Sequence, residues 1–345
     1  MSRIPSKERH LPSAVRGSSA ALGRCRSLKS RRSGSSWENT LKKASPVSIQ
    51  PLYVVGPTAS GKSALAIALA ERVGGEIVNA DAFQLYRGMN ICTAQPSPED
   101  LQRVPHHLYA VLDPRETSDA QRHCDLARPV IREIGERGKL PIVVGGSGLY
   151  VKALTHGLSA LPNDATLRAR LEHLTAAERV SWLLHRDPEA AQTVNLKNDR
   201  YVTRALEICL LTGQRQSELR KAWSQAAPEY RGIRLVWDRE ILSARIQQRV
   251  QKMAEAGLVA EIANLKELST TAEKAIGVRE IRAHLAGEYS LDQALEAIAL
   301  ATRQYARRQD KWFRREKGFV PLEVKEKQSP EELMETILMS FPDLK

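Results

Sequence analysis

The chain has 345 residues, 42% of them hydrophobic, and a net charge of +12 at pH 7. No apolar run reaches the about 18 residues that a membrane-spanning helix needs, so we expect a soluble chain with room for two domains. The cysteines lack the C-x-x-C spacing of zinc sites, which predicts reduced thiols in a reducing compartment. They are Cys25, Cys92, Cys124 and Cys209.

The positive charge is concentrated at the N-terminus. Residues 1–50 carry a net charge of +9, which leaves only +3 for the rest of the chain. Residues 1–48 are rich in Ser and Arg and lack apolar periodicity, so we expect a disordered basic extension. It could be an organelle transit peptide, an RNA-binding arm or sequence upstream of the true start, and we favour a dispensable extension. A nucleic-acid partner must therefore be argued from local basic patches.

The clearest motif begins at residue 52. Four apolar residues lead into G-x-x-x-x-G-K-S, and an alanine-rich segment with helical spacing follows at 64–73. This strand–loop–helix context predicts a P-loop, in which backbone N–H groups and the helix N-terminus hold a phosphate group. Lys62 can reach the terminal phosphate, and Ser63 can bind a Mg²⁺ ion that bridges two phosphates. The motif is typical of ATP-binding and other nucleotide-binding proteins. Its residues are Gly56, Pro57, Thr58, Ala59, Ser60, Gly61, Lys62 and Ser63.

Two further apolar segments end in polar residues. Residues 76–81 end at Asp81, and residues 140–145 open into a Gly-Gly-Ser-Gly turn at 145–148. Continuous apolar strands indicate burial on both faces, hence an α/β fold with a P-loop NTPase-like parallel sheet and helices on both faces. Because parallel strands end at one crevice, Asp81 and this turn should lie beside the bound phosphates. Alternatively, Asp81 holds magnesium or caps a helix, and the turn is a plain helix cap.

The second half of the chain is mostly helical. We expect an all-helical insertion at 158–229, a strand at 233–237 and a long helix from residue 240. Arg245 and Arg249, one helical turn apart, could clamp a diphosphate or lie on a solvated face. Residues 301–315 predict a basic helix suited to RNA backbone, with Tyr305 and Trp312 as core anchors. The expected domains are 1–48 (extension), 49–157 (core), 158–229 (helical insertion), 230–325 (core and basic helix) and 326–345 (tail or helix).

A series of short motifs follows in order along residues 50–325. They are GPTASGKS at 56–63, Asp81 with QLYRGM at 84–89, TAQP at 93–96, VGGSGLY at 144–150, RALE at 204–207, IG and RE at 276–280, and TRQYARRQ at 302–309 with Trp312. A P-loop alone is common, whereas this ordered series is specific. It resembles the tRNA dimethylallyltransferase family, also called tRNA isopentenyltransferases.

The resemblance implies transfer of the dimethylallyl group from dimethylallyl diphosphate to the N6 amine of the adenosine 3′-adjacent to the anticodon. The tRNAs would be those that read codons beginning with U, and diphosphate would be released. It also implies that the P-loop binds this diphosphate with Mg²⁺ instead of ATP. By the same resemblance, Asp81 takes the proton of the amine, Ser147 lies near the bridging oxygen and Arg249 binds diphosphate.

The resemblance also implies a set of tRNA contacts. They correspond to Asp81, Ala82, Phe83, Gln84, Ser147, Arg168, Arg200, Arg204, Lys274, Arg279, Arg307, Arg308, Gln309 and Arg314. The expected partners are the tRNA anticodon stem-loop and dimethylallyl diphosphate, with no membrane. We expect a bacterial-type monomer in the cytoplasm.

Three alternatives compete with this interpretation. A P-loop kinase for a small metabolite would leave the basic helix at 301–315 without a role. A prenyltransferase acting on free adenine nucleotides would not need that helix either. An RNA-binding module with a degenerate P-loop is disfavoured by the intact Lys62, Ser63 and Asp81.

Overall fold

The computed structural model describes residues 49–157, 161–225 and 230–344. The predicted basic extension at 1–48 lies outside the described residues. Among the described residues, no helix is both long and apolar enough to cross a membrane.

In the part of the chain that the structure describes, six strands form one sheet in the order β3-β2-β4-β1-β5-β6. Every neighbouring pair is parallel. The predicted α/β parallel sheet is therefore confirmed. The strands are β1 (Leu52–Val55), β2 (Glu76–Asn79), β3 (His106–His107), β4 (Pro141–Gly145), β5 (Arg231–Trp237) and β6 (Phe319–Val324).

Helices cover both faces of the sheet because alternate strand residues feed two separate apolar clusters. One cluster joins Leu52 and Val54 of β1 to α1 (Lys62–Val73) and α15 (Pro330–Ser340). The other joins Tyr53 and Val55 to α4 (Ala120–Glu136), α5 (Gly148–His156) and the C-terminal end of α14 (Leu291–Phe313). The central strands are buried on both sides, which explains their continuous apolar sequences.

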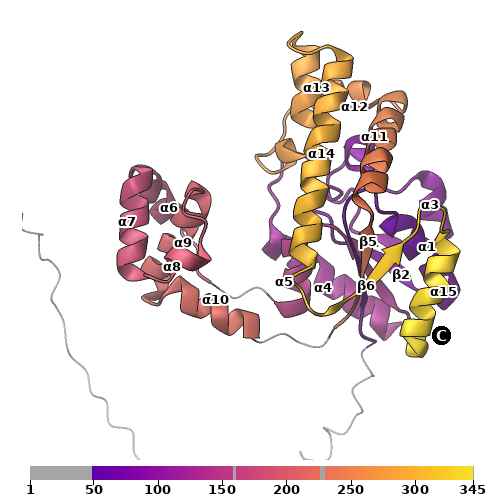
Figure 1. Cartoon of the computed structure of the whole chain (residues 1–345), viewed down its shortest axis with the longest axis horizontal. Coiled ribbons are helices and arrows are strands. Elements are labelled where there is room, and N and C mark those ends of the chain that lie inside the picture. The colour runs from indigo at the N-terminus through magenta and orange to yellow at the C-terminus, as the bar shows by residue number, and fades with distance from the viewer. Residues whose placement is uncertain (1–48, 158–160, 226–229, 345) are drawn as a thin grey trace, which may run out of the picture. The chain divides into compact units, whose positions relative to one another are not determined.

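Three helices that contribute to the site belong to the second of these apolar clusters. α14 packs along α11 (Arg239–Glu255) and α13 (Val278–Leu285), and all three stand beside the sheet in Figure 1. The basic helix expected at 301–315 is the second half of α14, which starts earlier, at a capping box on Ser290. Three short elements complete this part: α2 (Asn90–Thr93), α12 (Leu258–Asn264) and a 3₁₀ turn at Ala272–Lys274. Two others, α3 (Pro98–Arg103) and a 3₁₀ turn at Pro342–Leu344, pack against α1 and α15.

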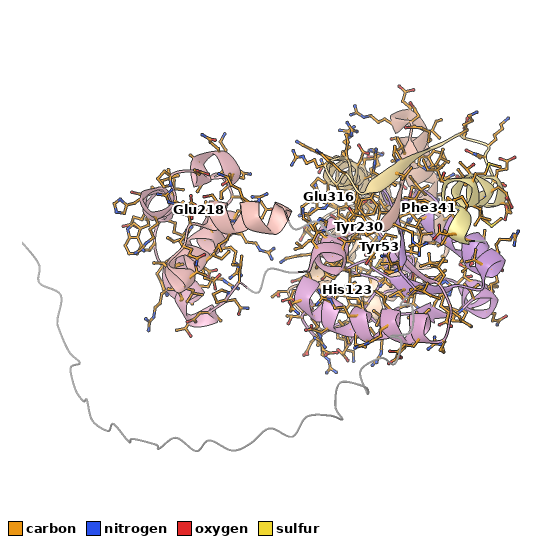
Figure 2. The ribbon with its side chains drawn as sticks, turned by 90° about the horizontal axis from the view of Figure 1, so that it is seen from below. Tyr53, His123, Glu218, Tyr230, Glu316 and Phe341 are labelled. Carbon is orange, nitrogen blue, oxygen red and sulfur yellow. The ribbon has the colours of Figure 1, made fainter. Side chains whose placement is uncertain are left out.

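Aromatic rings pack where β1 and β5 begin, at the sheet end away from the P-loop. Tyr230 lies edge-on to Tyr53, with ring centroids 5.9 Å apart, and 5.1 Å from Phe319 at the start of β6. Figure 2 shows Tyr53 and Tyr230 close together in the core. These contacts hold β5 and β6 against β1, and the opposite end of the same strands carries the P-loop.

Residues 161–225 form a separate helical group, which interrupts the α/β order between α5 and β5 (Figure 1). Its apolar centre includes Leu171, Leu183 and Leu206. The Asp187 carboxylate, fully buried, accepts hydrogen bonds from the Ser217 N–H at 2.8 Å and its hydroxyl at 2.6 Å. The helices are α6 (Ala165–Glu172), α7 (Ala176–Arg186), α8 (Ala190–Thr193), α9 (Asp199–Thr212) and α10 (Gln216–Gln225).

Candidate active site

The P-loop connects the end of β1 to the start of α1. Three side chains donate hydrogen bonds to its backbone carbonyl groups. Lys62 Nζ donates to the Pro57 carbonyl at 2.8 Å, and Trp237 Nε1 donates to the Ser60 carbonyl at 2.9 Å. Arg245 Nε donates to the Ala59 carbonyl at 3.0 Å. The first N–H groups of α1 have no partner within the helix, so this loop is suited to bind an anion.

Three charged side chains from different elements act on one another beside this loop. Burial lowers the pKa of Lys62 to about 8, with the positive charge of Arg249 adding to the shift and Asp81 opposing it. Burial also lowers the pKa of Arg249, again opposed by Asp81. Arg249 Nη1 donates to the Thr58 hydroxyl at 3.2 Å, which brings α11 onto the P-loop. Two cations thus lie beside one carboxylate, an arrangement that an anionic ligand would stabilise.

Asp81 lies two residues after the end of β2 and is fixed by short polar contacts. Its N–H donates to Asn79 Oδ1 at 2.8 Å, and the Asn79 amide donates to the Leu108 carbonyl at 2.9 Å. Asp81 Oδ1 accepts the Phe83 N–H at 3.0 Å. One carboxylate oxygen therefore orients the side chain, while the second can accept a hydrogen bond from a ligand.

The Gly-Gly-Ser-Gly turn at 145–148 lies against the segment that follows β2. Ser147 is buried, and its hydroxyl accepts the Ala82 N–H at 3.0 Å. A Cβ atom at Gly145 would lie 2.3 Å from the Ala80 carbonyl oxygen, so only glycine permits this approach of β4 to the segment after β2. The turn therefore lies next to Asp81, as expected for segments that follow the carboxyl ends of neighbouring parallel strands.

A cavity joins these polar groups to an apolar surface. Thr58, Asp81 and Arg249 line it together with Tyr305 and apolar side chains. The other lining residues are Phe83, Cys92, Thr93, Ile246, Val250, Met253, Leu258, Ala275, Ile276, Ile298 and Thr302. The cavity therefore offers a mainly hydrocarbon wall beside a charged, phosphate-binding loop.

Further polar and charged residues singled out from the sequence lie around the cavity and on α14. Gln84 is half-buried, and its amide donates to the carbonyls of Thr93 and Ala94 at 3.1 and 2.7 Å. The exposed group consists of Lys274, Arg279, Arg307, Arg308 and Arg314. Arg307 and Arg314 line a groove of about 450 Å³, between α14 and the β5–α11 segment, that reaches Pro57 of the P-loop. Gln309 differs because it is buried and bonds to backbone groups.

Three arginines singled out from the sequence lie in the helical group. Arg168 and Arg204 both pair with the fully buried carboxylate of Glu207, at 3.1 and 2.7 Å. Arg200 is exposed at the start of α9. Glu207 ends the RALE motif at 204–207 but had no role predicted from the sequence, although its place three residues after Arg204 on one helix was a usable signal.

Two aromatic residues differ from their expected role as core anchors. Tyr305 lines the cavity, where burial raises its pKa and the nearby Asp81 adds to the shift. Trp312 keeps 39% of its surface exposed and packs over Gly148, where a Cβ would lie 2.3 Å from the indole ring. The seven-residue spacing placed both on one side of α14 but could not show that this side faces the site.

Comparisons with known proteins agree with this geometry. The family model for IPP transferase matches residues 84–316. The tRNA dimethylallyltransferase of Geobacter metallireducens is 46% identical over 283 residues, which cover 79% of this chain and 92% of that protein. That of Akkermansia muciniphila is 42% identical over 83% of this chain and 98% of its own length.

Solved structures give the same result. The tRNA isopentenylpyrophosphate transferase of Bacillus halodurans matches with a TM-score of 0.63 and 34% identity, over 86% of this chain and 96% of that one. A eukaryotic dimethylallyltransferase acting on tRNA matches with a TM-score of 0.70 and 27% identity, over 80% of this chain and 74% of that one. The chain belongs to the IPP transferase family.

Proposed function

We propose that this enzyme transfers the dimethylallyl group of dimethylallyl diphosphate to the N6 amine of the adenosine 3′-adjacent to the anticodon, in tRNAs that read codons beginning with U. The observation that carries the proposal is the cavity in which the P-loop, Asp81 and Arg249 meet an apolar wall. A charged diphosphate with a five-carbon hydrocarbon tail matches such a site in both of its parts.

The diphosphate is assigned to the P-loop. Lys62 and Arg249 supply positive charge, and the N–H groups at the start of α1 supply hydrogen bonds. Diphosphate gains negative charge as it leaves, so the same groups stabilise the transition state more than the bound substrate. The dimethylallyl group would lie along the apolar residues of α11, α13 and α14.

Mg²⁺ fits this donor set as a partner of the diphosphate. Among the described residues, no group of three or more His, Cys, Asp or Glu could hold a metal by itself. Mg²⁺ in phosphate sites commonly takes one or two protein oxygens and completes its shell with phosphate and water. The hydroxyl of Ser63, the second residue of α1, would be the protein ligand. When bound, the ion neutralises charge on the leaving diphosphate.

Asp81 is assigned to the acceptor. The adenine amine is a weak nucleophile, so a carboxylate within hydrogen-bond reach would take its proton as the nitrogen attacks. The new bond joins N6 to C1 of the dimethylallyl group, the C1–oxygen bond breaks, and the electron pair leaves with diphosphate. The Ser147 hydroxyl accepts a hydrogen bond from the N–H of Ala82, the residue after Asp81. From this position Ser147 would help to orient the reacting groups.

The RNA is assigned to the exposed basic residues. The adenosine must leave the anticodon loop to enter the cavity, as in base flipping. The exposed arginines of α14 and the 274–279 segment would contact the backbone beside the cavity, and Arg168, Arg200 and Arg204 would contact it from the helical group. We further propose a monomer that works in the cytoplasm.

The test is a transfer assay with labelled dimethylallyl diphosphate, Mg²⁺ and either unmodified tRNA or free AMP. We expect label in tRNA alone, and a loss of about 10²–10⁴ in rate for Asp81→Asn with the affinity for dimethylallyl diphosphate retained. Label in AMP would instead indicate a nucleotide prenyltransferase. No label, together with phosphoryl transfer from ATP, would overturn the proposal in favour of a kinase.

A further inference from the structure

Gln309 on α14 joins two loops of the site that are far apart in the sequence. Its Oε1 accepts the Thr58 N–H of the P-loop at 2.8 Å. Its Nε2 donates to the Gly146 carbonyl of the Gly-Gly-Ser-Gly turn at 2.9 Å. Only 4% of the residue is exposed, so both bonds are shielded from water.

The backbone of the turn and a second contact at Thr58 enclose the Gln309 amide closely. A Cβ atom at Gly146 would lie 2.2 Å from Gln309 Nε2, so the turn approaches the amide as closely as a glycine allows. Thr58 receives a second contact, since its hydroxyl accepts Arg249 Nη1 at 3.2 Å. Gln309 therefore fixes the backbone of the same residue whose side chain meets Arg249.

The two loops carry different halves of the reaction. The P-loop would hold the diphosphate, and the turn carries Ser147, which bonds to the residue after Asp81. A side chain that ties one loop to the other determines how far the leaving group lies from the base. Such a tie matters because a misplacement of about 1 Å can cost 10²-fold in rate.

We propose that Gln309 is a positioning residue that sets the spacing between the diphosphate site and the Asp81–Ser147 side of the cavity. This inference rests on the proposed function for the identity of the two substrates. It differs from the tRNA contact expected for Gln309 from the family resemblance, because only 4% of the residue is exposed and both ends of its amide already bond to backbone groups of the protein.

The test uses Gln309→Met, which keeps most of the volume and removes both hydrogen bonds. We expect the dissociation constant for Mg²⁺-diphosphate to rise about tenfold or more and the kcat for transfer to fall by at least as much. The dissociation constant for tRNA should stay unchanged. Gly146→Ala disturbs the same contact from the other side, so it should give the same result, and the double variant should be little worse than either alone.

Gln102→Met is the control, because Gln102 is exposed on α3, away from the site, and its replacement should leave all three quantities unchanged. Amide hydrogen exchange gives a second readout: Gln309→Met should speed exchange in residues 56–61 but not along the rest of α14. A loss of tRNA affinity with diphosphate binding intact would overturn the proposal, as would wild-type values throughout. Diphosphate binding is measured without transfer, so a wild-type enzyme that binds diphosphate yet modifies no tRNA would refute the proposed function alone.

Discussion

The lowered pKa of Lys62 predicts that binding of dimethylallyl diphosphate weakens as the pH rises. Burial moves the pKa from 10.5 to about 8, with Arg249 adding to the shift. This difference corresponds to about 3 kcal/mol against the charged lysine in the ligand-free fold. The folded chain sheds this proton more readily than the unfolded chain, so this residue's contribution to stability increases with pH between about 8 and 10.5.

A bound diphosphate favours the protonated lysine, so it restores the charge that burial disfavours. At pH 9 only about one lysine in eleven carries the proton in the free enzyme, and the dissociation constant should be about tenfold higher than at pH 7. Isothermal titration calorimetry between pH 7 and 9.5, in buffers of different ionisation enthalpy, should show uptake of close to one proton at the upper end. The RNA is left out so that no transfer occurs.

Lys62→Arg is the control for this prediction, because a guanidinium keeps its proton throughout the range. Its affinity should be weaker at pH 7 but should not fall further towards pH 9.5. A wild-type affinity that is flat across the range, with no proton uptake, would refute the argument that a buried, partly deprotonated Lys62 binds the diphosphate.

Three further predictions concern other charged groups. Arg249→Lys should raise the dissociation constant for diphosphate at least tenfold in the same calorimetric assay, since a lysine lacks the guanidinium fork. Glu207→Gln should weaken tRNA binding several-fold in a filter assay without changing diphosphate affinity, because Arg168 and Arg204 lose their common anionic partner. An unchanged tRNA affinity would exclude that role. Burial alone would raise the pKa of Glu76, but hydrogen bonds from His107, Arg137 and Lys139 outweigh it and lower the pKa to about 2. Its stabilising contribution is complete above about pH 4.5 and is lost towards pH 2, so thermal unfolding of Glu76→Gln should depend less on pH in that window.

The central sheet and the chemical type of the site could both be predicted from local sequence patterns. Continuous short apolar runs favour strands buried on both faces, and a P-loop between such a strand and a helix indicates the binding of phosphate groups. The carboxyl ends of parallel strands share one edge, which is why Asp81 and the turn at 145–148 could be placed beside the P-loop before the structure was known.

Which face of each helix meets the site depends on how the helices pack in three dimensions. Helical spacing places Tyr305 and Gln309, four residues apart, on one side of α14 and Arg303 on another, but only the packing of α14 against α11, α13 and α5 shows which side is buried. Tyr305 consequently lines the cavity and Gln309 joins two loops, whereas Arg307 and Arg308 between them are exposed. These contacts join residues more than 150 positions apart, and local sequence patterns carry no record of such pairs.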